Sequence, residues 1–186
     1  MLKKIILTFF FLLNFIEPLY ASVKDEIINN LIKINNLSFN FKQTIDEKTE
    51  EGNCIIEYPK KIFCSYNNLK RKIMVSNGKS LVIKNQINNQ YYRYSLKKTP
   101  LELILDKNFL IDQIKELESK TVDNQYINFT IAKNNNKINI FFDKKTLNLI
   151  GWQTKDIYQN LVITYIYKIQ YNQKIDKNIF KLPEMN

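Results

Sequence analysis

The stretch that decides the fold is IMVSNGKSLVIKNQINNQYYRYSLKKTPLELIL, residues 73–105. A short apolar run leads into Asn77-Gly78, the dipeptide most typical of a tight β-hairpin, and residues 80–84 return from it. A further strand is predicted at residues 90–96, because alternate apolar side chains there share one face. The alternation then stops at Thr99-Pro100. The stretch therefore predicts antiparallel strands that run directly into a helix.

The residues after this break predict a short helix that is apolar on most of its surface. Thr99 is a candidate N-cap, Pro100 suits the first helical position, and Glu102 would complete a capping box. The apolar side chains are those of Leu101, Leu103, Ile104 and Leu105. Such a helix either lies in a core or covers an apolar cavity, and the pattern alone leaves both interpretations open. A second helix is predicted at residues 109–117.

Working outward, the chain reads as one helix followed by strands on both sides of this helical interruption. The first helix is predicted at residues 23–35, and period-two alternation marks a strand at 37–42. Further strands are expected at residues 53–58, 61–66, 125–132, 137–143, 148–155 and 161–170. The predicted fold is mainly β, an incomplete, strongly curved antiparallel β-barrel (half-barrel) of about eight or nine strands covered by about three short helices. A closed eight-stranded barrel is the alternative.

The two cysteines flank a turn in the predicted hairpin. Centring that turn on Pro59 places Cys54 opposite Cys64, and residue 56 opposite residue 62. A cross-strand disulfide fits this register, whereas two buried thiols are the alternative. Neither interpretation makes the pair catalytic.

The N-terminus has the pattern of a secretory signal peptide. Lys3 and Lys4 precede an apolar run at residues 5–15, and a small residue, Ala21, follows a helix-breaking proline. The run is shorter than the roughly 20 residues that span a bilayer. We therefore expect residues 1–21 to be removed near Ala21, leaving residues 22–186 as a single exported domain.

Composition excludes several common functions. The chain has no histidine and only three glycines, so it has neither a His-based catalytic site nor a Gly-rich phosphate loop. Its net charge of +10 comes from 26 lysines but only two arginines. Nucleic-acid binders rely on arginine, and the many Lys, Asn and Ile residues are typical of an AT-rich genome, so no nucleic-acid site is predicted. We expect neither an enzyme nor a cofactor or metal; a hydrolase using Asp106 and Asp112 lacks a paired-carboxylate motif.

The sequence resembles the outer-membrane lipoprotein carrier family, the LolA-type periplasmic chaperones. Residues 73–105 resemble the family's central block, a V-S-D/N-G-K hairpin, a strand and a T-P followed by an apolar helix. FKQT at 41–44, the hairpin Pro59, Gly-Trp at 151–152 and DKNIFKLP at 176–183 also match.

The resemblance implies a half-barrel whose helices form a lid over an apolar cavity. The expected function is a monomeric periplasmic carrier that shelters acyl chains of lipoproteins. Its expected partners are acylated lipoproteins, an inner-membrane lipoprotein-releasing ABC transporter and an outer-membrane lipoprotein acceptor. The alternative is an exported lipid-binding or envelope-stress-sensing domain of the same fold.

This chain matches some of the family's site residues and departs from others. Where members carry a lid-latching arginine before the hairpin proline, this chain has Tyr58, whose hydroxyl offers one donor in place of five. Tyr58 is therefore the candidate latch, and the lid is expected to be held differently or less firmly than in the family. Pro100, Leu101 and Ile104 match the lid helix. The sheet residues expected to line the cavity are Phe39, Phe41, Ile62, Met74, Leu81 and Ile83. Ordinary core packing is the alternative role for each of them.

Overall fold

The computed structural model describes residues 22–67, 71–88, 90–133, 136–156 and 159–185. The predicted signal peptide, residues 1–21 with its cleavage point near Ala21, lies outside the described residues. Within the described ranges, no helix is both long and apolar enough to cross a membrane.

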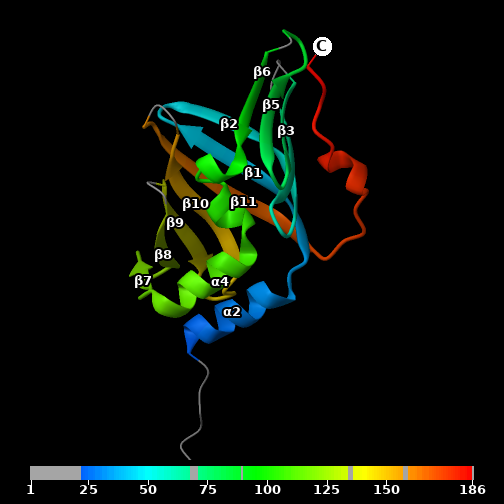
Figure 1. The fold of residues 1–186 in the computed structure, drawn as a ribbon. Helices are drawn as coiled ribbons and strands as arrows, with labels where there is room; N and C mark the ends of the chain where they lie inside the picture. Colours follow the sequence, from blue (N-terminus) through cyan, green and yellow to red (C-terminus); the bar gives the residue numbers. More distant parts are fainter. Residues whose placement is uncertain (1–21, 68–70, 89, 134–135, 157–158, 186) are drawn as a thin grey trace, which may run out of the picture.

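One antiparallel sheet of eleven strands forms the body of the protein, in the order β6-β5-β4-β3-β2-β1-β11-β10-β9-β8-β7 (Figure 1). The strands are β1 Asn36–Ile45, β2 Lys48–Glu57, β3 Lys61–Tyr66, β4 Lys72–Asn77, β5 Ser80–Asn85, β6 Tyr91–Ser95, β7 Lys120–Val122, β8 Tyr126–Lys133, β9 Asn136–Asp143, β10 Leu149–Lys155 and β11 Leu161–Tyr171. The two edge strands, β6 and β7, are not neighbours in the sheet, so it stays open. This confirms the predicted half-barrel and excludes the closed barrel.

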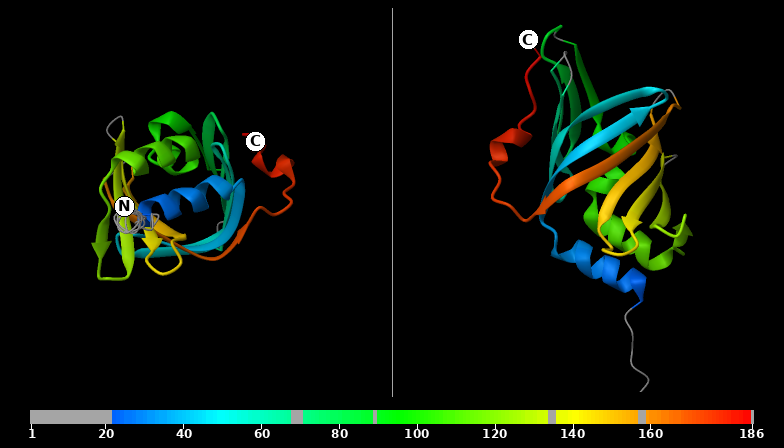
Figure 2. Two further views of the ribbon diagram at one scale, coloured as in Figure 1. Left: turned by 90° about the horizontal axis from the view of Figure 1, so that it is seen from below. Right: turned by 180° about the vertical axis from the view of Figure 1, so that it is seen from behind.

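Helices close the open side of the curved sheet. They are α2 Val23–Lys33, α3 Glu102–Leu105 and α4 Lys107–Glu116, and a short 3-10 turn, η2 Leu96–Lys98, precedes α3. A second 3-10 turn, η3 Lys177–Phe180, lies elsewhere, near the C-terminus. Seen from below, the sheet curves around α2 and the α3–α4 segment (Figure 2). We call the face of the sheet that meets these helices the concave face.

Local sequence explains why α2 begins where it does. Ser22 accepts a hydrogen bond from the Asp25 amide, and the Asp25 carboxylate accepts one from the Ser22 amide, which together form a capping box. The helix then buries Ile27, Ile28 and Leu31 on the side that faces the sheet. Its apolar stripe therefore sets its place over the opening.

The hairpin predictions are confirmed in register. Cys54 pairs with Cys64 and Ile56 with Ile62 across β2 and β3, as the turn at Pro59 requires. Asn77-Gly78 joins β4 to β5, and Gly78 has a φ of 95°. Asn77 Oδ1 accepts hydrogen bonds from the backbone amides of Lys79 and Ser80.

The predicted capping box at Thr99 is wrong. The Thr99 hydroxyl donates to the carbonyl of Leu96 at 2.8 Å, and the chain makes a tight turn before α3 begins at Glu102. The Glu102 carboxylate instead pairs with Lys60, 42 residues away in the sequence. The Glu102 side chain therefore forms an ion pair with a residue remote in the sequence and does not complete a capping box.

The C-terminal segment packs on the outside of the half-barrel. After β11 the chain crosses to the outer face of β3 and β4, where Phe180 of η3 is buried (Figure 2). The ammonium of Lys61 lies 5.8 Å from the centre of the Phe180 ring. This segment explains why Val75, which points away from the concave face, is nonetheless 1% exposed.

Candidate functional site

The concave face presents continuous rows of side chains across the sheet. Strand register places Phe39 opposite Cys54, Cys64 opposite Met74, and Met74 opposite Ile83. The adjacent row runs from Leu37 through Ile56, Ile62 and Ser76 to Leu81. All six sheet residues predicted to line a cavity (Phe39, Phe41, Ile62, Met74, Leu81 and Ile83) therefore lie on this one face.

The helices occupy the space in front of these rows. Phe41, Ile62 and Ile104 are 2%, 1% and 0% exposed and belong to one buried cluster, together with Phe39 and Leu81. Met74 and Leu101 are partly buried against that cluster, whereas Ile83 and Pro100 lie outside it. The helices thus cover the apolar face.

The interior has a second apolar wall, which sequence reasoning missed. Strands β8, β9 and β10 contribute Phe129, Ile140, Phe142 and Trp152, each no more than 6% exposed. The rings of Phe39 and Trp152 meet edge to face across this interior, with centroids 6.3 Å apart. The same period-two alternation that identified these strands could have identified the inward residues.

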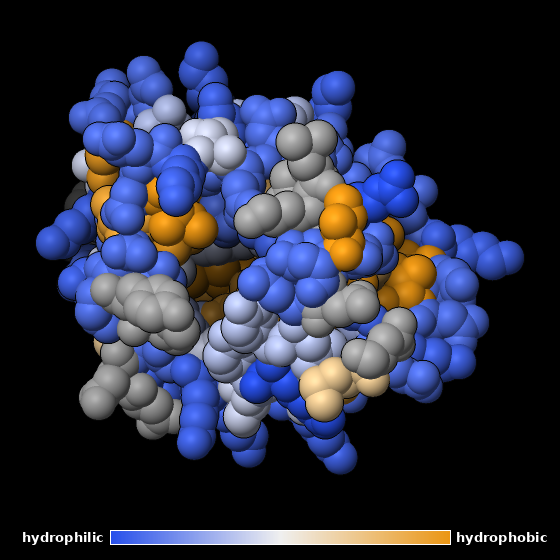
Figure 3. Space-filling model, turned by 90° about the horizontal axis from the view of Figure 1, so that it is seen from above, coloured by the Kyte–Doolittle hydropathy of each residue, from blue (hydrophilic) through white to orange (hydrophobic). Residues whose placement is uncertain are grey.

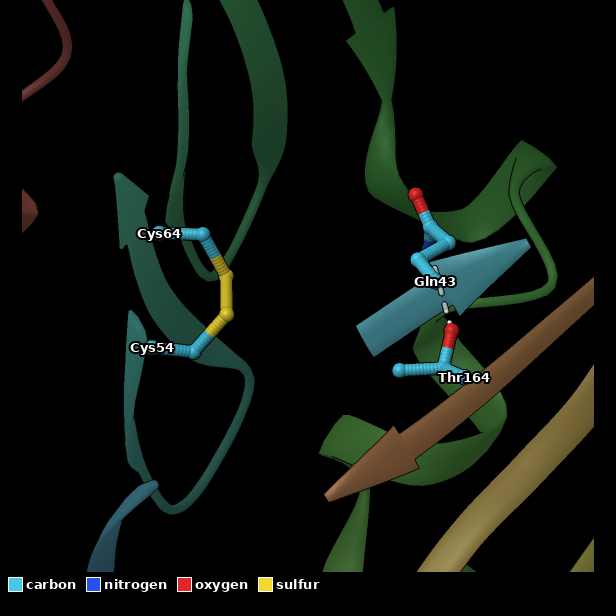
Figure 4. Close-up of a disulfide and its surroundings, with 4 residues drawn as sticks. All are labelled: Gln43, Cys54, Cys64 and Thr164. Atoms are coloured by element: carbon cyan, nitrogen blue, oxygen red, sulfur yellow. Dashed lines mark hydrogen bonds between the residues drawn. A yellow bond between two sulfur atoms is a disulfide. The ribbon is translucent and has the colours of Figure 1, made fainter. Parts of the chain in front are cut away.

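A disulfide joins Cys54 and Cys64 on the concave face (Figure 4). The two residues face each other on β2 and β3 with their Cα atoms 4.1 Å apart, and both side chains are buried. The bond therefore links two central strands of one wall, next to Phe39 in the same row.

Replacing both cysteines by serine should lower the free energy of unfolding by about 2–3 kcal/mol, because the crosslink restricts the unfolded chain. Chemical denaturation of the wild type and of Cys54→Ser/Cys64→Ser measures this difference. Reducing the wild-type protein should produce the same loss. Equal midpoints for oxidised and reduced protein would show that the bond does not stabilise the fold.

Lys60 connects the β2–β3 turn to the helices. Its ammonium lies 2.9 Å from an Asp106 carboxylate oxygen and 3.2 Å from one of Glu102. Its backbone amide also donates to the carbonyl of Leu105, the last residue of α3, at 2.8 Å. Ser76, a buried residue of β4, donates to the Lys60 carbonyl at 3.0 Å. One residue thus ties α3, the α3–α4 junction and the sheet together.

The electrostatics of this tie favour the charged lysine. The hydrogen bond to Asp106 raises the pKa of Lys60 above its ordinary value of 10.5, and the contact with Glu102 adds to this against the opposing effect of burial. Because the folded-state pKa is raised, the stabilisation is complete below about pH 10 and is lost only as the pH rises through the folded pKa. The tie is therefore fully formed at neutral pH.

Tyr58, the residue predicted as the latch, lies two positions before Lys60 and contacts the helices differently. Its side chain packs against the buried cluster, and the ammonium of Lys107 in α4 lies 5.6 Å from its ring centre. Among the described residues, its hydroxyl makes no hydrogen bond to α3 or α4, and burial raises the pKa of the phenol. The polar contacts expected of Tyr58 are made instead by Lys60, which sequence reasoning missed because its partners are remote in the chain.

Lysines also tie the helices to one another. Lys107 donates to the carbonyls of Ile34 at 2.6 Å and Ile32 at 3.2 Å, beside the end of α2. From the other direction, Lys24 of α2 donates to the carbonyl of Lys115 in α4 at 2.8 Å. We therefore treat α2, α3 and α4 together as the helical cover of the concave face.

The end of the molecule at which β10 turns into β11 is hollowed. A pocket of about 310 Å³ lies there between the start of the helical segment and strands β9 and β10. Its lining includes Pro100, Thr154, Lys98, Lys137 and Lys155. Seen from above, a hollow with apolar atoms at its bottom opens between polar side chains (Figure 3). The described residues contain no group of three or more side chains suited to holding a metal ion.

Comparisons with known proteins agree with this architecture. A family model described as outer membrane lipoprotein carrier protein LolA matches residues 32–183. No curated protein matches the sequence significantly.

Solved structures with a similar arrangement share little sequence with the chain. An uncharacterised conserved protein from Thermus thermophilus is similar at a TM-score of 0.50 and 6% identity, over 86% of this chain and 93% of that one. A LolA superfamily protein from Nitrosomonas europaea gives 0.47 and 8%, over 87% and 99%. A putative outer membrane lipoprotein-sorting protein domain from Vibrio parahaemolyticus gives 0.49 and 8%, over 84% and 95%. At such identities the likeness concerns the fold alone, whereas the family model covers most of the sequence. The chain belongs to the outer membrane lipoprotein carrier protein LolA family.

Proposed function

We propose that this protein is a periplasmic carrier that shelters the acyl chains of lipoproteins released from the inner membrane and delivers them to the outer membrane. The observation that carries this proposal is the largely apolar concave face, which is covered by short helices tied to the sheet through the ion pairs of Lys60. Its partners would be acylated lipoproteins, an inner-membrane lipoprotein-releasing ABC transporter and an outer-membrane lipoprotein acceptor.

The need for such a carrier follows from the cost of exposing acyl chains to water. Each methylene moved from lipid to water costs about 0.8 kcal/mol, so a chain of about 16 carbons costs more than about 10 kcal/mol. Unassisted transfer across an aqueous compartment would therefore be very slow. A wall formed by Phe39, Phe41 and Ile62 would remove much of this cost.

The helical cover suggests how binding stays reversible. Leu103, Ile104 and Leu105 of α3 are at most 1% exposed because they fill the interior. An entering acyl chain would replace these contacts with contacts of the same apolar kind, so the net gain in buried area would be small. The protein would then hold its cargo weakly enough to transfer it, without making or breaking a covalent bond.

The expected export of the chain fits this role. A signal peptide at residues 1–21 would direct residues 22–186 to the periplasm. The alternative, an envelope-stress-sensing domain of the same fold, is not favoured, because the family model that matches is that of the lipoprotein carriers.

A displacement experiment tests the proposal. The environment-sensitive dye N-phenylnaphthylamine is bound to the purified protein, and a synthetic triacylated lipopeptide is added. We expect the lipopeptide to displace the dye, whereas the same peptide without acyl chains leaves it bound. If the acylated and unacylated peptides behave alike, the proposal is wrong.

A further inference from the structure

The concave face carries one polar pair between apolar rows, near the end at which β10 turns into β11. On the two central strands, Phe41 pairs with Ile166, and both are at most 2% exposed. The next inward row, two residues closer to the β10–β11 turn, pairs Gln43 with Thr164. Trp152 lies opposite Thr164 on the other side, so this polar pair is set into an otherwise apolar wall.

The two polar side chains bind each other. Gln43 Nε2 donates to Thr164 Oγ1 at 3.0 Å; Thr164 is 3% exposed and Gln43 is half-buried. In Figure 4 the Gln43 carbonyl oxygen points away from Thr164. Among the described residues, the Gln43 side chain makes no second hydrogen bond, so its oxygen and its other N–H are available. A Leu and a Val would fill this place without the desolvation cost of two polar groups.

The pair lies between the Phe41 row and the hollow at the end of the barrel. Thr154, which lines that hollow, pairs with Val162, one inward row beyond Thr164. Inward rows of a strand are about 7 Å apart, so a molecule extending from the hollow would reach the Gln43 row before the Phe41 row. Ile45 and Val162 form the row nearest the hollow, so the Gln43–Thr164 pair is flanked by apolar rows, and an acyl chain lying along the Phe41 row would place the group at its polar end against this pair.

We infer that Gln43 and Thr164 bind the carbonyl groups that join the acyl chains of the cargo to its polar end. The Gln43 amide can donate to an ester or amide carbonyl, and its oxygen can accept from the N–H of an N-linked acyl chain. The chains then extend past Phe41 toward the disulfide. This inference rests on the proposed function and adds that the ligand class is acyl esters and amides, as distinct from hydrocarbons in general.

Two lipids that differ only in the carbonyl test this inference. Displacement of N-phenylnaphthylamine is measured with 1-palmitoylglycerol, an ester, and with 1-O-hexadecylglycerol, the corresponding ether. We expect the wild-type protein to bind the ester about five- to tenfold more tightly, the effect of one net hydrogen bond. Gln43→Leu/Thr164→Val should bind both lipids with the affinity that the wild type has for the ether.

Thr44→Val is the matched control, because Thr44 follows Gln43 on β1 and points to the opposite face. It should keep the preference for the ester. Equal binding of the two lipids by the wild type, or an ester preference that survives in the double variant, would overturn the inference and leave the proposed function intact. Failure of the wild type to bind either lipid would overturn both.

Discussion

Replacing Lys60 by Met should loosen the helical cover and raise the binding of N-phenylnaphthylamine several-fold. The substitution removes the partner of Glu102, whose side chain is 6% exposed, and one partner of Asp106. Removing one member of a buried ion pair typically costs about 3–5 kcal/mol, because the remaining charge stays desolvated. Lys60 is 27% exposed, so a loss nearer 2 kcal/mol is expected here. Movement of α3 away from the sheet would return Glu102 to water and relieve that cost.

Lys61→Met is the matched control for this experiment. Lys61 is the next residue, but its ammonium pairs with Glu57, 3.1 Å away, on the opposite face of the hairpin, and its side chain is 37% exposed. Its replacement should leave dye binding unchanged. Unchanged dye binding in Lys60→Met as well would contradict the assignment of Lys60 as the tie between sheet and cover.

Tyr58→Phe separates the two candidate latches. The sequence-based hypothesis expects the loss of the hydroxyl to loosen the lid and raise dye binding. The structure supports a smaller effect, because the contact of Tyr58 with Lys107 is made through the ring, which phenylalanine keeps. A rise in dye binding equal to that of Lys60→Met would favour the hydroxyl as the latch.

Replacing Gly52 by Ala should destabilise the protein by about 3 kcal/mol or more, the upper end of the cost of overpacking. A Cβ at this position would lie 2.1 Å from the backbone oxygen of Ser65 and 2.9 Å from the Phe41 ring. Backbone cannot move aside as a flexible side chain can, so β2 and β3 would have to separate. The rings of Phe41 and Tyr66, 5.0 Å apart, close over this glycine and would be displaced with it.

Gly78→Ala is the control for Gly52→Ala. Gly78 has a φ of 95°, so alanine is strained there, but the nearest atom to an added Cβ is 3.8 Å away. Gly78→Ala should therefore lower the free energy of unfolding by only about 1 kcal/mol, the cost of the backbone conformation alone. Thermal unfolding of both variants gives the comparison. A Gly52→Ala protein no less stable than Gly78→Ala would show that the close approach of the strands is not required.

Features set by neighbouring residues were predictable from the sequence. The turn at Pro59 determined which residues face each other across β2 and β3, and Asn77-Gly78 marked the next hairpin. Period-two alternation then placed Phe39 and Phe41 on the concave face, because a strand turns successive side chains to opposite sides.

Features that depend on remote partners were not predictable in this way. The motif at Thr99 and Glu102 looked like a capping box, yet Lys60 takes the Glu102 carboxylate from 42 residues away. For the same reason, the sequence did not reveal that Lys60 ties the β2–β3 turn to α3. Closure of the barrel was undetermined because it depends on whether β6 pairs with β7, and no local pattern reports on that contact.

Release of lipoproteins from spheroplasts tests the central claim most directly. Purified residues 22–186 are added to Gram-negative spheroplasts that retain an active lipoprotein-releasing transporter and have accumulated newly made outer-membrane lipoproteins. The account predicts that these lipoproteins appear in the soluble fraction as complexes with the added protein. If a carrier native to the spheroplasts releases lipoproteins under the same conditions and this protein releases none, the claim that it carries lipoproteins is wrong.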